Sequence, residues 1–262
     1  MTDQLGAGDP ARPGHERVLL ITGASRGIGA ACAREAAAHG WAVCVNYAKQ
    51  RDAAQALVAG IEAGGGRAIA VQADVGEEDE VLRLFNACER ALGRVTDVVN
   101  NAGIVLPAHR VDELAAAALQ RMLQVNLFGA FIVAREAVRR ISTRHGGAGG
   151  VLVNISSVAA RLGSPNEYVA YAAAKAAIDT LTRGLALEVA SEGMRVVGIS
   201  PGLIDTEIHA SGGQLGRLER LAPSVPIGRA GTADEIAQVA LFLLGPGASY
   251  ITGTTIEVAG GR

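Results

Sequence analysis

The chain has 262 residues, of which 49% are hydrophobic and 19% charged, and its formal net charge is −2. This balance is typical of a globular protein and gives no reason to expect nucleic acid or an acidic membrane surface as a partner. The three cysteines and five histidines lack metal-ligand or CxxC spacing, so neither a metal site nor a disulfide framework is expected. These features predict a cytoplasmic α/β protein of enzyme size.

The N-terminal segment 1–16, MTDQLGAGDPARPGHE, is rich in Gly, Pro and charge and lacks the apolar core of a signal peptide. No uninterrupted apolar run reaches the roughly 18 residues of a membrane-spanning helix. We therefore expect a flexible tail at 1–16, one domain at 17–262 and no membrane partner.

From residue 17 onward, short β-branched runs alternate with longer patterns of helical periodicity. Seven strands are predicted at Arg17–Ile21, Trp41–Val45, Arg67–Gln72, Asp97–Asn100, Val151–Ile155, Arg195–Ile199 and Thr254–Val258. Helices are predicted around Ala30–His39, at Asp52–Ala63, at Glu77–Leu92, from about 112 to 143, between the fifth and sixth strands, and at Ala233–Leu244. Such alternation forms βαβ units, whose right-handed crossovers put helices on both faces of a parallel sheet. The pattern predicts an α/β, single-domain, doubly wound Rossmann fold with a mostly parallel seven-stranded sheet.

Two connections, residues 158–164 and 203–225, are too long and irregular for tight turns. Both follow the carboxyl ends of predicted strands, where doubly wound sheets bind ligands. Connections of this kind are usually binding loops or disordered, and their position favours binding loops.

The first strand runs into the glycine-rich turn TGASRGIG, residues 22–29. Glycines in such a turn allow a sharp reversal, a close approach of backbone N–H groups to a pyrophosphate, and close packing of the next helix. The spacing is GxxxGxG and not GxGxxG, so an ordinary strand–helix turn is the alternative. The position directly between strand and helix favours a dinucleotide-binding turn.

The choice of dinucleotide depends on the end of the second strand, Val45-Asn46-Tyr47. It carries no carboxylate to hold a ribose 2′-hydroxyl, as an NAD site usually does. Arg26 lies inside the glycine turn, and Lys49 and Arg51 follow the second strand. Because these cations would attract a 2′-phosphate, NADP(H) is predicted in preference to NAD(H).

Further motifs follow in order along the chain. They are ADV at 73–75, NNAG at 100–103, VN at 125–126, NISS at 154–157, YAAAK at 171–175 and PG at 201–202. With TGASRGIG, this series resembles the short-chain dehydrogenase/reductase family over residues 18–261, in its 3-oxoacyl-carrier-protein reductase-like and glucose 1-dehydrogenase-like branch. The resemblance implies an NAD(P)-dependent oxidoreductase that interconverts a carbonyl and an alcohol.

The resemblance also implies roles for individual residues. The four catalytic positions of the family match Asn126, Ser157, Tyr171 and Lys175. Ser157 and Tyr168 are expected to face the substrate. The residues expected to contact the cofactor are Gly23, Ser25, Arg26, Gly27, Ile28, Gly29, Asn46, Asp74, Val75, Asn101, Ala102, Gly103, Tyr171, Lys175, Pro201, Gly202, Ile204 and Thr206.

In the implied reduction, hydride passes from the nicotinamide to a carbonyl carbon while Tyr171 donates a proton to the oxygen. Ser157, chosen over Ser156 because it aligns with the family serine, would hydrogen-bond that oxygen. Lys175 would hold the ribose and lower the pKa of Tyr171, and Asn126 would support a water chain that feeds the lysine.

The segment NEYVAYAAAK, residues 166–175, holds two tyrosines on nearly the same helix face as Lys175. Residues 164–167, Ser-Pro-Asn-Glu, have the pattern of a capping box, which predicts Tyr168 in the first helical turn and Tyr171 in the second. At a rise of 1.5 Å per residue, Lys175 lies about 6 Å along the axis from Tyr171 but about 10.5 Å from Tyr168. Only Tyr171 is then close enough for the ammonium to lower its pKa. Tyr168 is expected to line the substrate pocket, with packing against the preceding loop as the alternative.

The two long loops carry charges of both signs and form no basic funnel for a phosphorylated or carrier-bound substrate. Acyl-carrier reductases often have an arginine in a LAREVA segment, whereas residues 185–190 read LALEVA, with Leu187 at that position. This disfavours a carrier-bound substrate, although Arg139, Arg140 and Arg144 could form a basic patch. A small-molecule carbonyl/alcohol oxidoreductase is preferred, with a 3-oxoacyl-carrier-protein reductase and a non-catalytic NADP-binding sensor as alternatives.

Apolar residues on two predicted helices belong either to the core or to a subunit interface. They are Phe128, Phe131, Ile132, Ile178, Leu181 and Leu185. The family resemblance implies a homodimer or homotetramer packed through these helices.

Overall fold

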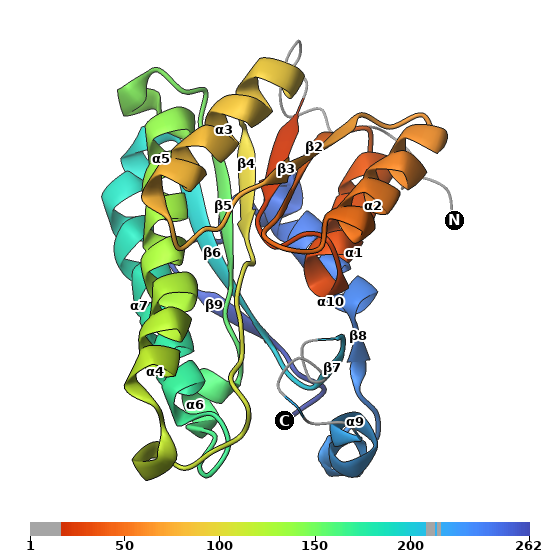
Figure 1. Cartoon of the computed structure of the whole chain (residues 1–262). Helices are drawn as coiled ribbons and strands as arrows, with labels where there is room; N and C mark the ends of the chain where they lie inside the picture. Colours follow the sequence, from red (N-terminus) through yellow and green to blue (C-terminus); the bar gives the residue numbers. More distant parts are fainter. Residues whose placement is uncertain (1–16, 208–212, 214–215) are drawn as a thin grey trace, which may run out of the picture.

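The computed structural model describes residues 17–207, 213 and 216–262, so the expected tail at 1–16 lies outside the described residues. Seven strands of the described part form one parallel sheet in the order β3-β2-β1-β4-β5-β6-β9 (Figure 1). The strands are β1 Val18–Ile21, β2 Ala42–Tyr47, β3 Ala68–Gln72, β4 Asp97–Asn100, β5 Gly150–Ile155, β6 Met194–Pro201 and β9 Thr255–Val258. This confirms the predicted doubly wound α/β fold. The strand order reverses between β1 and β4, and sheets of this type bind ligands at the carboxyl ends of the strands beside such a point.

Helices cover both faces of the sheet (Figure 1). One layer consists of α1 Gly27–Ala38, α2 Arg51–Ala63 and α10 Ala233–Leu244, and the other of α3 Glu78–Leu92, α5 Ala130–Ile141 and α7 Val169–Val189. The first strand shows why two layers form, since Leu19 and Ile21 belong to one buried apolar cluster and Val18 and Leu20 to the other. Successive side chains of a strand point to opposite faces, so a strand that is apolar throughout needs cover on both.

The long helical region predicted at about 112–143 is interrupted. It consists of the 3-10 turn Val111–Glu113, α4 Ala116–Leu123, a π-helical segment Gln124–Gly129, α5 and the 3-10 turn Thr143–His145. The π segment ends at Gly129, which lies close to the Val75 backbone. A Cβ added to Gly129 would lie only 2.7 Å from the Val75 carbonyl oxygen. The same segment carries Asn126, one of the predicted catalytic residues. π turns are frequent at functional sites, and hydrophobic periodicity does not reveal them.

By length and composition alone, the continuous helical stretch Ala116–Ile141 could cross a membrane. In the structure its second half packs on the sheet, where Val133, Ala137 and Ile141 are buried in the core. This is the packing of a core helix in a globular domain, and the absence of a membrane partner stays a prediction.

The helix α7 begins later than the sequence predicts. Its first residue is Val169, so the predicted capping box is absent and the first turn holds Tyr171 and not Tyr168. The reason is the backbone at Ser164 and Asn166, whose φ angles of 46° and 59° belong to turns. The backbone N–H of Tyr168 donates to the Ser164 carbonyl at 2.9 Å and closes this turn.

The two long loops contain short elements that the sequence did not predict. The first includes α6 Ala159–Leu162, and the second includes β7 Ile204–Asp205, which pairs with β8 Gly231–Thr232, and α9 Arg217–Leu221. All of these lie beyond the carboxyl ends of β5 and β6, at the lower end of the view in Figure 1. They therefore border the position where a ligand is expected.

Candidate active site

A cleft of about 600 Å³ opens at the carboxyl ends of the strands. Its size is in the range of small-molecule and cofactor sites. Every residue predicted to bind or to catalyse lines this cleft except Gly29 and Asn126, which lie in α1 and in the π segment. Within the described ranges, no group of three or more His, Cys, Asp or Glu side chains is arranged to hold a metal ion.

The glycine turn after β1 leaves no room for side chains. Gly23 and Gly27 have φ angles of 62° and 54°, which favour glycine. A Cβ on Gly29 would lie 2.8 Å from the Ala24 Cα, and one on Gly23 would lie 2.9 Å from the Ala102 Cα. The side chain of the N-cap residue, Arg26, does not cap α1, and the first turn of the helix has no acidic residue. Such a cradle fits the pyrophosphate of a dinucleotide.

Three polar side chains hold this turn in place. The Thr22 Oγ1 accepts from the backbone N–H groups of Asn101 and Ala102 at 2.9 and 3.0 Å. The Asn101 Nδ2 donates to the carbonyl groups of Thr22 and Gly23 at 2.9 and 3.0 Å. The Asn46 Oδ1 accepts from the Gly23 N–H at 3.0 Å. The turn is thus fastened to both neighbouring strand ends.

Two of these residues have a structural role that the sequence did not indicate. Asn46 lines the cleft and is 1% exposed, and its amide hydrogen-bonds to backbone groups and shapes the turn. Its contact with the cofactor stays a prediction. Thr22 was not singled out, although a hydroxyl directly after four buried strand residues is a signal for such a role.

Asp74 and Val75, expected at the adenine, lie beside Arg121 of α4 in the cleft. Arg121 forms an ion pair with the Asp74 carboxylate, whose Oδ1 also accepts from the Gly76 N–H at 2.9 Å. The sequence did not indicate Arg121, because this pair joins residues 47 positions apart.

Ser157, Tyr171 and Lys175 come together from two elements of the fold. Tyr171 and Lys175 lie one turn apart on α7, and Ser157 follows β5. Ser157 lies close enough to Tyr171 to act as a hydrogen-bond partner that lowers the pKa of the phenol, and the Lys175 Nζ lies 5.6 Å from the centre of the Tyr171 ring. The Lys175 Nζ also donates to the Ile155 carbonyl at 2.7 Å. Ser156 is buried, and its hydroxyl donates to the Lys175 carbonyl at 3.2 Å, so Ser157 is the serine beside the tyrosine.

Burial is the main cause of the pKa shifts of Tyr171 and Lys175. It raises the pKa of Tyr171 to about 12, and the hydrogen bond with Ser157 opposes this shift. It lowers the pKa of Lys175 to about 8, and the Asp179 carboxylate opposes this shift. The predicted lowering of the tyrosine pKa is therefore not found, because burial of the phenol raises its pKa more than Ser157 lowers it. Tyr171 is protonated at neutral pH, as a proton donor must be.

Asn126 lies behind the wall of the cleft. Its side chain accepts from the Ile104 N–H and donates to the Ile104 carbonyl, both at 2.8 Å. A Cβ on Gly103 would lie 3.5 Å from the Asn126 Oδ1 and 3.7 Å from the Lys175 Nζ, so this glycine lies between the two groups. Asn126 therefore positions the loop beside Lys175, and its support of a water chain stays a prediction.

Beyond Tyr171, the cleft is lined by Tyr168 and by Arg217 of α9. The rings of Tyr168 and Tyr171 lie edge to face with their centres 6.5 Å apart. The guanidinium carbon of Arg217 lies 5.0 Å from the centre of the Tyr168 ring, and its Nη1 donates to Glu167 at 2.6 Å. The sequence indicated Tyr168 but not Arg217, because α9 lies in a loop without clear periodicity.

Known proteins resemble this chain over nearly its whole length. A family model described as Enoyl-(Acyl carrier protein) reductase matches residues 23–262. "Uncharacterized oxidoreductase YgfF" of Escherichia coli K12 is 48% identical over 245 residues, which cover 94% of this chain and 99% of that protein.

Two solved structures also align with the chain. A short chain dehydrogenase from Burkholderia cenocepacia J2315 in complex with NADP has a TM-score of 0.85 and 34% identity, and the match covers 94% of this chain and 97% of that one. A 3-ketoacyl-(acyl-carrier-protein) reductase from Brucella melitensis complexed with NADH has a TM-score of 0.86 and 30% identity, with coverage of 94% and 98%. These matches agree with the sheet order and the glycine turn, and they confirm the family that the motifs indicated. The chain therefore belongs to the short-chain dehydrogenase/reductase family and is a nicotinamide-dependent oxidoreductase that acts on CH–OH and C=O groups.

Proposed function

We propose that the protein interconverts a small carbonyl compound and its alcohol with NADP(H), and that Tyr171 is the proton donor and acceptor. One observation carries this proposal: Tyr171 lies beside Ser157 and Lys175 in a cleft whose other end is the glycine cradle.

The residues of the chain bind and protonate the substrate oxygen, while the bound nicotinamide supplies the hydride. Ser157 donates a hydrogen bond to that oxygen, and Tyr171 donates its proton as negative charge develops there. Lys175, protonated below its pKa of about 8, places positive charge beside the tyrosinate that is left. In the oxidising direction the same tyrosinate accepts the proton of the alcohol.

The charges near the glycine turn favour NADP(H) over NAD(H). Asn46 occupies the end of β2, where NAD enzymes usually have a carboxylate. Arg26 and Lys49 line the cleft, and an arginine or lysine is a strong partner for a 2′-phosphate. The Asp74 carboxylate in the same region is paired with Arg121, which reduces its repulsion of a phosphate.

The cofactor preference is tested by measuring kcat/KM with NADPH and with NADH. We expect NADPH to be preferred at least about tenfold, and an Arg26→Ala/Lys49→Ala double variant to lose most of this preference. Arg51→Ala is the matched control, because Arg51 follows the same strand but does not line the cleft. A preference of the native protein for NADH would refute the cofactor assignment.

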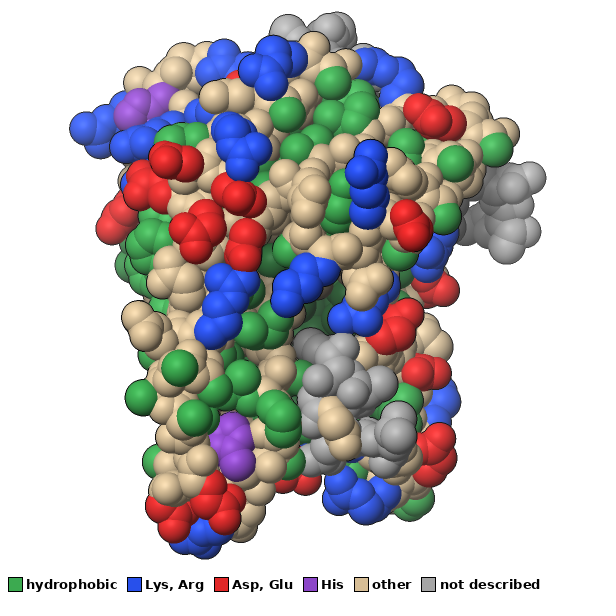
Figure 2. Space-filling model, viewed as in Figure 1, with side chains coloured by type: hydrophobic (Ala, Val, Ile, Leu, Met, Phe, Trp, Pro, Cys, Tyr) green, Lys and Arg blue, Asp and Glu red, His purple; other side chains and the backbone are tan. Residues whose placement is uncertain are grey.

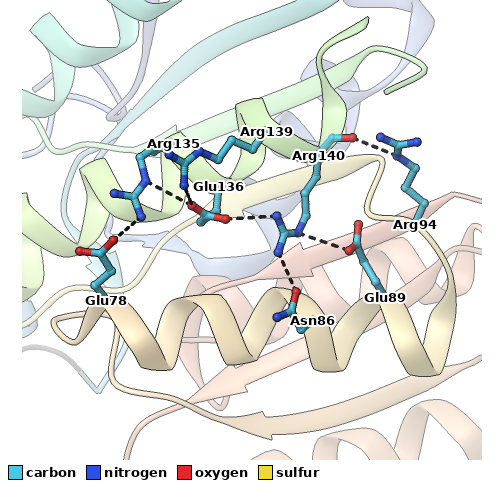
Figure 3. A network of polar contacts seen from close by, with 8 residues as sticks. All are labelled: Glu78, Asn86, Glu89, Arg94, Arg135, Glu136, Arg139 and Arg140. Carbon is cyan, nitrogen blue, oxygen red and sulfur yellow. Dashed lines mark hydrogen bonds and ion pairs between the residues drawn. The ribbon is translucent and has the colours of Figure 1, made fainter. Parts of the chain in front are cut away.

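A carrier-bound acyl substrate is the second candidate, since one aligned structure is a 3-ketoacyl-(acyl-carrier-protein) reductase. Docking of an acidic carrier protein would require an available basic patch. Arg139 and Arg140 instead pair with Glu136 at 2.9 and 3.1 Å, and Arg144 pairs with Glu192 at 3.6 Å. Figure 3 shows Glu136 at the centre of this network, and Figure 2 shows acidic and basic side chains interspersed over the face. A small-molecule substrate is therefore favoured.

A panel of ketones, aldehydes and alcohols, assayed with both cofactors through nicotinamide absorbance, tests the class of activity. The panel should include an acyl thioester to represent the carrier-bound alternative. Turnover of small ketones or alcohols well above that of the thioester is the expected result. Tight cofactor binding without any turnover would favour a non-catalytic sensor instead.

The predicted homodimer or homotetramer also remains part of the proposal. Phe128 and Phe131 are 39% and 48% exposed beside the start of α5, whereas Ile132 and Ile178 are buried in the chain's own core. Exposed aromatic side chains of this kind are typical of subunit interfaces. Light scattering should give a mass of two or four chains, and a Phe131→Glu variant should shift the protein towards the monomer.

A further inference from the structure

A series of hydrogen bonds crosses the core close to the active site, and the proposed reaction does not use it. The Asn100 Nδ2 donates to the Ala130 carbonyl and to the Asn154 Oδ1, both at 3.0 Å. The Asn154 Nδ2 donates to the Thr182 Oγ1 at 2.9 Å, and that hydroxyl donates to the Ile178 carbonyl at 2.8 Å. These bonds join the neighbouring strands β4 and β5 to α5 and α7, which cover the same face of the sheet (Figure 1).

The three side chains of this amide–hydroxyl network, Asn100, Asn154 and Thr182, lie in a layer that is otherwise apolar. Asn154 and Thr182 are 0% and 1% exposed, and Asn100 is 7% exposed. Burial of polar groups costs free energy, and apolar side chains of similar shape could fill the same space without that cost. A satisfied polar network adds rigidity instead, because each hydrogen bond fixes how two elements lie against each other.

The α7 half of the amide–hydroxyl network lies next to the contacts of Lys175. Asn154 directly precedes Ile155, whose carbonyl accepts from the Lys175 Nζ at 2.7 Å. Thr182 lies about two helical turns after Lys175, so both side chains are on the same face of α7. The bond between Asn154 and Thr182 therefore fixes this face of α7 against the end of β5. A shift of α7 along β5 would separate the ammonium from the carbonyl that holds it.

The other half of the network reaches the segment that carries Asn126. Ala130, whose carbonyl accepts from Asn100, is the first residue of α5 and directly follows the π segment. A Cβ on Gly103 would lie 3.5 Å from the Asn126 Oδ1 and 3.7 Å from the Lys175 Nζ. The amide–hydroxyl network thus joins the elements that support both groups beside this glycine.

We propose that Asn154 and Thr182 are positioning residues of the reaction, and that their hydrogen bond holds Lys175 in its place beside the tyrosine. The proposal rests on the reaction proposed at Tyr171. Both residues act through Lys175, because neither lines the cleft. A displacement of about 1 Å can lower a rate by about 100-fold, so a bond that fixes α7 against β5 can control turnover without touching the substrate.

The test removes one hydroxyl from α7. Thr182→Val keeps the volume of the side chain and leaves the Asn154 Nδ2 without its acceptor. A single turnover with a ketone of the panel is followed with protein in excess over NADPH, so that only bound cofactor reacts. We expect the rate to fall about 10–100-fold and the Kd for NADPH to stay within about threefold of the native value. Thr182→Ser keeps the hydroxyl and should stay within about threefold of the native rate.

Thr180→Val is the matched control on the same helix. The Thr180 hydroxyl also donates to the carbonyl four residues earlier, that of Ala176 at 3.3 Å, but it is exposed. Its loss should leave the single-turnover rate within about twofold of the native value. A rate in Thr182→Val as high as in this control would overturn the proposal.

A second variant separates positioning from stability. Asn100→Leu/Asn154→Leu replaces both amides with apolar side chains of similar size, and the Thr182 hydroxyl keeps its bond to the Ile178 carbonyl. The variant should therefore be more stable than Thr182→Val in urea unfolding, but its single-turnover rate should still be at least about tenfold below the native rate. If the rate recovered together with the stability, the network would have a structural role alone and the proposal would be wrong.

Lysine-selective ¹³C labelling gives a readout that does not depend on turnover. The chain has two lysines, Lys49 and Lys175, so Lys49 is an internal control. At a pH below the Lys175 pKa of about 8, Thr182→Val should shift the NMR signal of the Lys175 Cε and leave that of Lys49 in place, and Thr180→Val should shift neither. An unmoved Lys175 signal in Thr182→Val would overturn the positioning role even if the native protein reduced ketones. A moved signal in a protein without turnover would refute only the proposed reaction.

Discussion

The two ends of the cleft are built in different ways. At the cofactor end, the side chains of Thr22, Asn46 and Asn101 hydrogen-bond to backbone groups at the ends of neighbouring strands. At the substrate end, the pairs Arg217–Glu167 and Arg161–Glu257 join side chains across long sequence distances, as Arg121–Asp74 does beside the cofactor end. Hydrogen bonds to the backbone tie the cofactor end to the sheet. The substrate end is formed by side chains of the loops, each of which a single substitution can replace.

Loss of the Tyr171 hydroxyl should have the largest effect and should separate the two ends. Tyr171→Phe removes the proton donor, so kcat should fall by about 10³-fold while the Kd for NADPH stays within about threefold of the native value. Tyr250→Phe is the control, because Tyr250 is fully exposed and lies outside the cleft. Native turnover in Tyr171→Phe, measured by NADPH oxidation, would refute the catalytic assignment.

Crowding of the glycine turn should affect the cofactor end. In Gly29→Ala the new methyl would lie 2.8 Å from the Ala24 Cα and from the Asn101 Nδ2. We expect about 1–3 kcal/mol of destabilisation and cofactor binding that is about 10–100-fold weaker, measured by urea unfolding and fluorescence titration.

Gly60→Ala is the control for Gly29→Ala, and it should change stability in the opposite direction. Gly60 lies inside α2, and a Cβ there would meet nothing within 4 Å. It should stabilise the protein by about 0.5–1 kcal/mol, because alanine favours a helix interior. Equal behaviour of the two variants would show that the turn tolerates side chains and does not form the cradle described here.

Lys175 should make stability depend on pH. Its folded pKa of about 8 lies below the ordinary lysine pKa of 10.5, so the unfolded chain binds more protons between these pH values. Stability should therefore rise between about pH 8 and pH 10, by at most about 3 kcal/mol, and Lys175→Met should lack this rise. Tyr171, with its raised pKa of about 12, acts in the opposite sense only above pH 10. Parallel stability curves for the two proteins, from urea unfolding across this range, would contradict the burial of a titrating lysine.

The smallest effect is expected at an exposed ion pair of the substrate end. Arg161 and Glu257 pair at 2.9 Å with 54% and 46% of their side chains exposed. Because solvent screens such pairs, Glu257→Gln should change the Tm by no more than about 2 °C in calorimetry. A larger fall would mean that the loops of this end are held together more firmly than their exposed contacts indicate.

The difference between local and long-range contacts explains how much could be predicted from the sequence. Apolar runs and glycines are local signals, so the seven strands, the glycine turn and the Tyr171–Lys175 pair were predicted correctly. The start of α7 was not, because the left-handed turn at Ser164 and Asn166 overrides a local capping pattern. Arg121 and Arg217 were missed because their partners lie 47 and 50 positions away. Tertiary packing creates such contacts, and no local pattern encodes them.

In the proposed reaction, hydride passes between a nicotinamide and a carbonyl carbon beside Tyr171. Its most direct test is the transfer of deuterium from NADPH labelled at the transferable position to members of the ketone panel, followed by mass spectrometry of the alcohol. The account predicts deuterium on the carbinol carbon with the native protein and almost none with Tyr171→Phe, although both bind the cofactor. Unlabelled products, or equal labelling by the two proteins, would contradict it.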